Sequence, residues 1–499
     1  MICKSTRPRR RRRRKYIRPR FQLLVFVVIL SVMCGVRISR YSLRLPYDPQ
    51  DYSSTVWKPV ASDSFATTIT KSHRSFTNST SVTSHAITST LERPLILSTN
   101  VKVAGGSTTV GMSHSHNATF SFCLLVKDDN DILNEWLAYH YHTLNLRHVI
   151  VAIDPSSKTS PSPIFDKWQE LFGLKVEIWT DSDYMPEYFV QGNYDQVPSF
   201  LPDYIKANIS ASLWHVTAGI TDTDRIRRDL QHINNHRFRQ AMFLHKCVLS
   251  VRQKHDEQKQ KSEEGVTSPS WLAHIDSDEY IVVNPRVRAR SPKALQGLSP
   301  VTPHASSVLD FLEDMFVHYP KRLSRACLAL PSMLFGAIED DRESFTEGSA
   351  RRYSVPSGWN TTRFETLRWK YHAAFNDTIS GLQKTIMDVS VIRSTDMIFH
   401  RHAHSIHRPS IESCRQMKLR PDFDSIRLYP LTVNHYVGSY ERYIGRDDVR
   451  RNEEVYRRKA SVKSGGKDDD WMMGWLGSFI ETHGQGRVSM VLQDYLERS

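Results

Sequence analysis

The sequence has few cysteines and lacks several motifs that would assign a function by themselves. Six cysteines in 499 residues exclude a small protein built on disulfides. The chain contains no P-loop, no G-x-S-x-G element, no paired C-x-x-C and no internal repeat. It does contain 39% hydrophobic and 10% aromatic residues, enough for a large packed core, which excludes a linker or a disordered adaptor.

Positive charge is concentrated at one end of the chain. The net charge is +14, but residues 1–20 hold eleven Lys and Arg and no acidic residue. The remaining residues carry 56 basic and 53 acidic side chains, a net charge of only +3. Because a nucleic-acid-binding domain carries its basic excess on the folded body, general nucleic-acid binding is disfavoured. A tail that binds nucleic acid is the alternative, and topology or retention signalling explains the tail better.

One uncharged run follows the basic tail directly. Phe21 to Val36 contains only Gln22 and Ser31 as polar residues. As a helix it would be about 24 Å long, against a hydrocarbon core of roughly 30 Å, so flanking Tyr and Arg side chains would have to reach outward to the interfaces. The positive-inside rule keeps the N-terminus in the cytosol and places residues after about 40 in the lumen. The alternative is a cleaved signal peptide.

A Ser/Thr-rich segment separates this run from the rest. Between Ala61 and Thr90, sixteen of thirty residues are Ser or Thr, a composition typical of an O-glycosylated stem that does not order itself. N-x-S/T acceptors at five positions support a lumenal location weakly: Asn78, Asn117, Asn208, Asn360 and Asn376. In an oxidising lumen, Cys123, Cys247, Cys327 and Cys414 allow three pairings, and the sequence selects none of them.

From Phe120 onward, strands and helices alternate. Buried strands are predicted over 121–126, 147–153 and 174–180, with helices over 131–144 and 164–172 between them. This β-α-β-α-β order predicts an α/β fold whose parallel sheet binds ligands at the carboxyl ends of its strands. Residues 184–235 interrupt the rhythm as an insertion, and 237–253 predict a further helix.

The most informative element follows the apolar strand Trp271 to Ile275. Asp276 and Asp278 come next, and strand alternation sends both carboxylates to the same side of the sheet edge. Two carboxylates so spaced can share Mg²⁺ or Mn²⁺, which neutralises the diphosphate that leaves when a nucleotide sugar reacts. The plain alternative is a solvated acidic loop. A short anchor, a stem and a β-α-β-α-β start together favour the metal-binding interpretation.

Several stretches in this order resemble glycosyltransferase family 92 and related family-2-like glycosyltransferases. Residues 123–146 (CLLVKDDNDILNEWLAYHYHTLNL) are similar to the family's opening element, and the helix 240–247 with WLAHIDSDEY to its D-x-D-E-F element. Met333 to Gly336, Lys384 to Ile392 and Asn434 to Arg446 resemble later elements, over about residues 120–450. The chain departs from the family at Asp128 and Asp129, where Asn-Glu is usual, and at Arg446, where Lys is usual.

The resemblance implies a GT-A (Rossmann-like) fold, a nucleotide-sugar donor and a metal held by Asp276 and Asp278. It also implies that Asp154 contacts the nucleoside and that the loop from Lys127 to Asn130, with Asp128, covers the base. For Asp154 the plain alternative is a helix or turn cap. A late histidine often supplies a third metal ligand in such enzymes, and we expect His435 or His402 to do so here. Packing and hydrogen bonding on a half-buried strand is the alternative for these histidines.

An inverting transfer also needs a carboxylate that deprotonates the acceptor hydroxyl. Glu339, Asp340 and Asp341 follow an apolar strand expected over Cys327 to Phe335, and Asp340 is our candidate base. A solvated acidic loop is again the alternative. Helices near Trp471 to Leu476 and Val488 to Leu496 are expected to cover the core.

Together these patterns predict a single-pass type II Golgi membrane glycosyltransferase with its catalytic domain in the lumen. It would move a hexose, with galactose from a UDP-sugar as the first donor to consider, to a glycan hydroxyl. A metal-dependent hydrolase, or a membrane-tethered lectin or degenerate transferase, is the alternative. The expected organisation is a cytosolic tail over 1–20, an anchor over 21–37, a stem over 38–118, a GT-A domain over 119–460 and a helical extension over 461–499.

Overall fold

A computed structural model describes the main part of the chain after residue 117. The described residues are 118–198, 223–261, 270–284, 303–318, 326–338, 355–374, 384–392, 429, 431–446, 448, 450–467, 472 and 474–496. They belong to one compact unit. The predicted tail, the anchor and nearly all of the stem lie in residues 1–117, outside the described part. None of the helices in the described part combines the length and the apolar character needed to cross a bilayer.

The larger sheet has six strands in the order β3-β2-β1-β4-β9-β6. Its first four strands run parallel, as the alternating pattern predicts: β3 (Lys175–Trp179), β2 (Leu146–Ile153), β1 (Thr119–Val126) and β4 (Ser270–His274). The strand β9 (Lys384–Asp388) is antiparallel to both of its neighbours, β4 and β6 (Cys327–Leu330). The chain therefore has a mixed α/β fold, and the carboxyl ends of β1, β2 and β4 share one edge.

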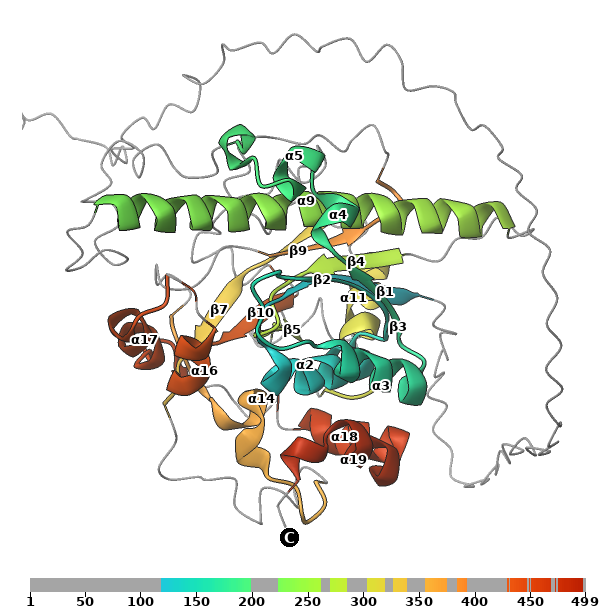
Figure 1. The fold of residues 1–499 in the computed structure, drawn as a ribbon. Helices are drawn as coiled ribbons and strands as arrows, with labels where there is room; N and C mark the ends of the chain where they lie inside the picture. Colours follow the sequence, from blue (N-terminus) through green and yellow to red (C-terminus); the bar gives the residue numbers. More distant parts are fainter. Residues whose placement is uncertain are drawn as a thin grey trace, which may run out of the picture. The chain divides into compact units, whose positions relative to one another are not determined.

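Helices cover both faces of this sheet (Figure 1). On one face lie α2 (Asn130–Thr143) and α3 (Ser162–Phe172), themselves contacted by α18 (Trp475–His483) and α19 (Gln485–Val491). The long helix α9 (Thr223–Lys261) packs against β1 and β4 on the other face. Alternation along β1 explains the two layers, because Phe122 and Leu124 join the core under α2 whereas Cys123 joins the core under α9.

The helix α9 is much longer than the segment 237–253 that the apolar spacing predicts. At its carboxyl end the polar run continues the helix, because side chains one turn apart bond one another. Arg252 donates to Asp256 at 2.9 Å, and Gln253 donates to Glu257 at 2.9 Å. At its amino end the helix includes residues that the sequence assigns to the insertion.

A second sheet carries strands in the order β11-β8-β7-β10-β5. These are β11 (Gly466–Lys467), β8 (Tyr371–His372), β7 (Ser332–Phe335), β10 (Leu431–Tyr436) and β5 (Glu279–Val283). The single strand expected over 327–335 is wrong: it divides at Pro331, and β6 pairs with β9 whereas β7 pairs with β10 in the other sheet. Proline has no N–H to donate, so the ladder breaks there and the chain changes sheets.

Shorter helices complete the described part. They are α4 (Asp181–Tyr184), α5 (Glu187–Val190), α11 (Ser307–His318), α14 (Glu365–Arg368), α16 (Tyr440–Gly445) and α17 (Glu453–Ala460), with 3-10 turns at Tyr194–Gln196, Thr361–Arg363 and Gln493–Tyr495. A disulfide between Cys123 and Cys247 ties β1 to α9. This selects one of the pairings that the sequence leaves open. Cys327 is disulfide-bonded as well.

Candidate functional site

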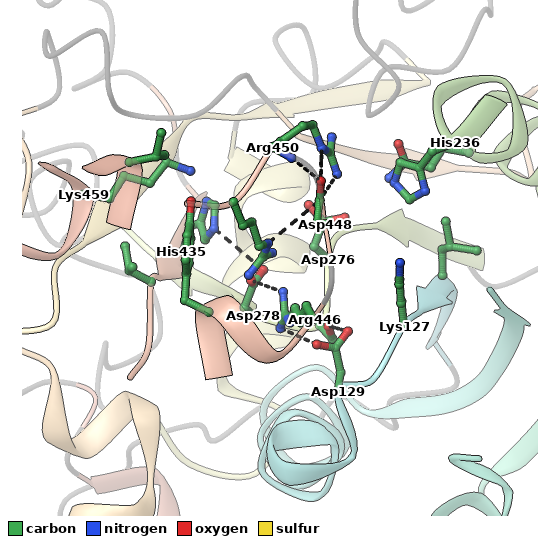
Figure 2. Close-up of a pocket in the computed structure, with 17 residues that line it drawn as sticks. Lys127, Asp129, His236, Asp276, Asp278, His435, Arg446, Asp448, Arg450 and Lys459 are labelled. Carbon is green, nitrogen blue, oxygen red and sulfur yellow. Dashed lines mark hydrogen bonds and ion pairs between the residues drawn. The ribbon is translucent and has the colours of Figure 1, made fainter. Parts of the chain in front are cut away.

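A cavity of about 290 Å³ lies at the carboxyl edge of the parallel strands (Figure 2). Lys127 and Asp129 enter it from the loop after β1, and Asp276 to Asp278 from the loop after β4. The other walls come from α9, from the end of β10 and from residues 443–459. Because the strand order reverses between β1 and β4, this edge is where open α/β sheets bind their ligands.

Two side chains of the helix α2 hold the chain directly after the Asp276–Asp278 loop. The indole Nε1 of Trp136 donates to the carbonyl oxygen of Glu279 at 2.9 Å, and the hydroxyl of Tyr139 donates to that of Ile281 at 2.9 Å. The strand β5 starts directly after Asp278, so these two bonds fix where the loop ends. The E-W-L-A-Y-H segment thus supports the site and does not line the cavity.

Asp278 belongs to a buried bridge of three side chains. The guanidinium Nη1 of Arg446 donates to Asp278 Oδ2 at 2.9 Å, and the same guanidinium pairs with the carboxylate of Asp129. Ser277 Oγ also donates to Asp129 Oδ2 at 2.6 Å. Burial by itself would raise the pKa of Asp278, but Arg446 and then His435 more than offset it and lower the pKa. Asp278 is therefore ionised at neutral pH.

Asp276 is held by a second internal cation. Lys384 Nζ, at the start of β9, lies 2.9 Å from Asp276 Oδ2 and 2.8 Å from Glu279 Oε2. Burial would lower the pKa of Lys384, but these two carboxylates raise it. Of the two aspartates, Asp276 is the more exposed to the cavity, with 36% of its side chain accessible against 6% for Asp278.

His435 lies beside Asp278 in the wall of the cavity, as Figure 2 shows. Its Nε2 lies 3.8 Å from Asp278 Oδ1, and its Nδ1 lies 3.7 Å from Glu279 Oε1. Burial lowers the pKa of His435 to about 4, so its imidazole is neutral at neutral pH. A neutral ring next to an ionised carboxylate is a pair that metal ions can use.

The predicted metal ligands are thus brought together in part. Two ligands of one Mn²⁺ or Mg²⁺, each about 2.1 Å from the ion, are up to about 4.2 Å apart, and the Asp278–His435 separation of 3.8 Å falls within that span. Asp276 is turned to Lys384 instead. The described residues include no group of three or more His, Cys, Asp or Glu side chains that could hold a metal ion by themselves.

Residues 448–459 bring a set of cations that the sequence analysis does not single out. Arg450 pairs with both oxygens of Asp448, with Nε 2.9 Å from Oδ1. Arg451 and Lys459 also line the cavity. In the sequence these residues stand among acidic neighbours, in a mixed-charge stretch typical of a solvated helix. The sequence pattern therefore does not predict that they line a cavity.

The remaining predicted contacts lie at the other end of the cavity or behind it. Lys127 lines the cavity. Asp128 has a positive φ of 52° and its Oδ1 accepts from the backbone N of Lys158 at 2.7 Å, so it clamps the loop after β2. Asp154 accepts from Ser156 N at 2.9 Å and Oγ at 2.6 Å, which is a turn cap. Asp128 and Asp154 are not among the cavity-lining residues.

Asp154 reaches the cavity through another side chain. Nδ1 of His236, on α9, lies 3.5 Å from Asp154 Oδ2, and His236 lines the cavity. Burial would raise the pKa of Asp154, but His236, Ser156 and Arg239 lower it. The predicted base Asp340, with Glu339 and Asp341, and the predicted ligand His402 lie outside the described residues.

Comparison of the chain with protein-family models gives no match, and comparison with curated proteins gives none either.

Proposed function

We propose that this chain is a glycosyltransferase of the GT-A type that transfers a hexose from a UDP-sugar to a glycan hydroxyl with inversion. Galactose is the first donor sugar to test. The observation that carries the proposal is the cavity at the β1–β4 crevice, where Asp276, Asp278 and His435 face Arg450, Arg451 and Lys459. A ligand with a diphosphate between a nucleoside and a sugar fits a site with this mixture of charges.

The strand order supports the same proposal. A parallel β3-β2-β1-β4 set is followed by the antiparallel β9, and the acidic loop follows β4. This is the arrangement we expect of a GT-A domain, and it accounts for the placement of the loop at the ligand-binding edge. The resemblance of residues 120–450 to family 92 and family-2-like transferases points the same way.

The residues present fit a bound Mn²⁺ or Mg²⁺ through Asp278 and His435, with phosphate oxygens and water as the other ligands. The ion would neutralise the charge on the departing diphosphate. Arg446 lowers the pKa of Asp278 and fixes its orientation, and Lys384 fixes the orientation of Asp276. We propose Asp340 as the base that takes the proton of the acceptor hydroxyl.

The proposed location is the Golgi membrane, with the basic tail in the cytosol, one N-terminal span, and the described residues in the lumen as part of a glycoprotein. The disulfide between Cys123 and Cys247 supports a lumenal position, because disulfides persist in oxidising compartments. Protease protection in sealed Golgi vesicles tests this topology: residues 118–499 should resist protease until detergent opens the vesicles, and cleavage without detergent would contradict it.

One observation favours a second candidate, a membrane-tethered lectin or an inactive transferase. Both carboxylates of the predicted metal pair already have internal cations as partners, Lys384 and Arg446. Such a chain would bind a sugar or a nucleotide without turning it over. The two candidates differ in catalysis and not in binding, so one experiment separates them.

That experiment is a donor-hydrolysis screen on the purified full-length chain in detergent, with Mn²⁺, with Mg²⁺ and with a chelator. Release of one nucleotide that requires the metal and is lost in Asp278→Asn is the expected result. Asp166→Asn is the matched control, because Asp166 is an exposed acid on α3. Nucleotide binding without release would support the inactive transferase. Neither binding nor release with any donor would refute the proposed function.

A further inference from the structure

The cavity has a cationic end. Arg450, Arg451 and Lys459 line it, together with the carboxylate of Asp448. Arg450 takes both oxygens of Asp448, whereas Arg451 Nε is 3.9 Å from Asp448 Oδ2. Asp276 and Asp278 also act on these cations, but the five Lys and Arg residues that line the cavity outnumber its four Asp residues, so a bound anion would neutralise the remaining positive charge.

Lys459 is the most available of these cations. Within the described part of the chain its ammonium makes no ion pair or hydrogen bond, and it lies over the ring of Tyr443, 5.8 Å from Nζ to the centroid. Burial, together with the charge of Arg451, lowers the pKa of Lys459 to about 8. A half-buried lysine in a cavity wall without a carboxylate partner is a binding site for an anionic oxygen.

The opposite end of the cavity presents hydrogen-bond acceptors. His236 and Gln240 are one turn apart on α9 and line the cavity together. A proton on His236 Nδ1 points to Asp154 at 3.5 Å, which leaves Nε2 as an acceptor. Gln240 is 6% exposed, and its Oε1 has no hydrogen-bond partner in the described part of the chain. A buried acceptor without a donor costs about 1–3 kcal/mol, which a ligand donor would recover.

Figure 2 shows the two ends on opposite sides of the site. Lys459 lies at one side and His236 at the other, with Asp276, Asp278 and Asp448 between them. The Lys459 end therefore supplies a cation for oxygen acceptors, and the His236 end supplies acceptors for N–H or O–H donors beside the ammonium of Lys127. A nucleoside diphosphate has this polarity, because its base and ribose carry donors and its diphosphate carries only acceptors.

We propose that a nucleoside diphosphate lies across the cavity with its nucleoside against His236 and Gln240 and its diphosphate against Lys459. The inference rests on the proposed function and deepens it, because it assigns the two halves of the ligand to two separate groups of side chains. Gln240 and His236 select the nucleoside, and Lys459 anchors the phosphates whichever nucleoside is bound.

Titration calorimetry with UDP and with inorganic pyrophosphate tests the assignment on the full-length chain in detergent, with Mg²⁺ present throughout. Lys459→Gln should weaken both probes about tenfold, the effect of losing one hydrogen bond to a charged group. Gln240→Leu should weaken UDP about fivefold and leave pyrophosphate unchanged, because only the nucleoside half is affected. Lys459→Arg keeps the charge and should restore most of the pyrophosphate affinity.

Lys246→Gln is the matched control, because it removes the same charge from an exposed lysine of α9 that does not line the cavity, and it should leave pyrophosphate binding within about twofold. If Gln240→Leu does not fold, His236→Asn tests the same end. Equal pyrophosphate affinity of Lys459→Gln and the unmodified chain would overturn the inference, as would a larger loss with Lys246→Gln. Neither result touches the proposed function, which fails if the unmodified chain releases no nucleotide from any donor.

Discussion

Replacing Arg446 by methionine should destabilise the fold strongly, because Arg446 is the shared partner of two buried carboxylates. Arg446, Asp129 and Asp278 are 7%, 4% and 5% exposed, so water cannot take the place of the guanidinium. Removing one partner of a buried ion pair typically costs about 3–5 kcal/mol, because an uncompensated charge stays behind. Methionine keeps much of the side-chain volume, so the loss comes mainly from the charge and not from a cavity.

The pH dependence of the unfolding free energy tests the same role of Arg446 independently. In the native chain the pKa of Asp278 is lowered, so its contribution is present above its unfolded pKa of about 3.9 and disappears as pH falls through the folded value. In Arg446→Met both carboxylates lose their counter-charge: the pKa of Asp129, which burial already raises in the native chain, rises further, and the pKa of Asp278 loses the main effect that lowers it. The deficit of the variant should therefore be largest at pH 7 and shrink as pH falls toward 5.

Urea unfolding followed by tryptophan fluorescence at pH 7 and pH 5 measures both effects. Arg457→Met is the control, because Arg457 makes an exposed pair with Glu453 on α17, with 76% and 56% of the side chains accessible, and should change stability by no more than about 0.5 kcal/mol. Adding Asp278→Asn to Arg446→Met should recover part of the loss. A difference below about 1 kcal/mol between the native chain and Arg446→Met at pH 7 would refute the reasoning.

Two further predictions concern the scaffold around the site. Replacing Cys123 and Cys247 together by alanine should lower the unfolding free energy by up to about 5 kcal/mol, because the disulfide joins residues 124 apart and constrains the unfolded chain. Urea midpoints under oxidising conditions measure this loss, and an unchanged midpoint would contradict the prediction. Gly438→Ala should lower the melting temperature more than Gly358→Ala. Both glycines have positive φ, but only at Gly438 would the new Cβ meet a side chain, Arg442 Nη2 at 1.9 Å, so equal losses would exclude that clash as the cause.

Continuous apolar runs made the parallel sheet predictable. The strand expected over 147–153 is observed as Leu146–Ile153, and the one over 121–126 as Thr119–Val126. Such runs report burial on both faces, which is a local property of a parallel strand. The end of α9 was not predictable in the same way, because its polar last turns depend on side-chain pairs and not on an apolar face.

Pro331 shows a different limit. The apolar run around it is as continuous as that of β1, yet the chain leaves one sheet and enters another at this residue. The sequence shows a proline at this position. It does not show whether the strand ends there, forms a bulge or continues in another sheet. The outcome depends on which strands pair with the segments on either side of Pro331. These partners, β9 and β10, lie about fifty and about one hundred residues further along the chain, so the local sequence does not identify them.

The sequence predicted the position of the carboxylate pair but not the partners that surround it. Asp276 and Asp278 stand two residues apart, and the end of a buried strand identifies them as a site. Their partners inside the fold are Lys384 and Arg446, which are 108 and 168 residues away in the chain. A spacing rule contains no information about such partners.

An isolated pair of carboxylates would need a cation from solution to be stable at a sheet edge, whereas here the fold brings two cations of its own. What remains for a ligand to do is therefore set by two groups that Lys384 and Arg446 do not hold. One is Asp278 Oδ1, 3.8 Å from His435 Nε2, and the other is the ammonium of Lys459, which makes no ion pair or hydrogen bond within the described residues. Metal dependence measured with Lys459 intact and with Lys459→Gln tells how the two share the charge of the ligand. If the lysine carries part of that charge, its loss should raise the metal concentration needed for half-maximal nucleotide binding, and an unchanged requirement would show that the ion acts alone.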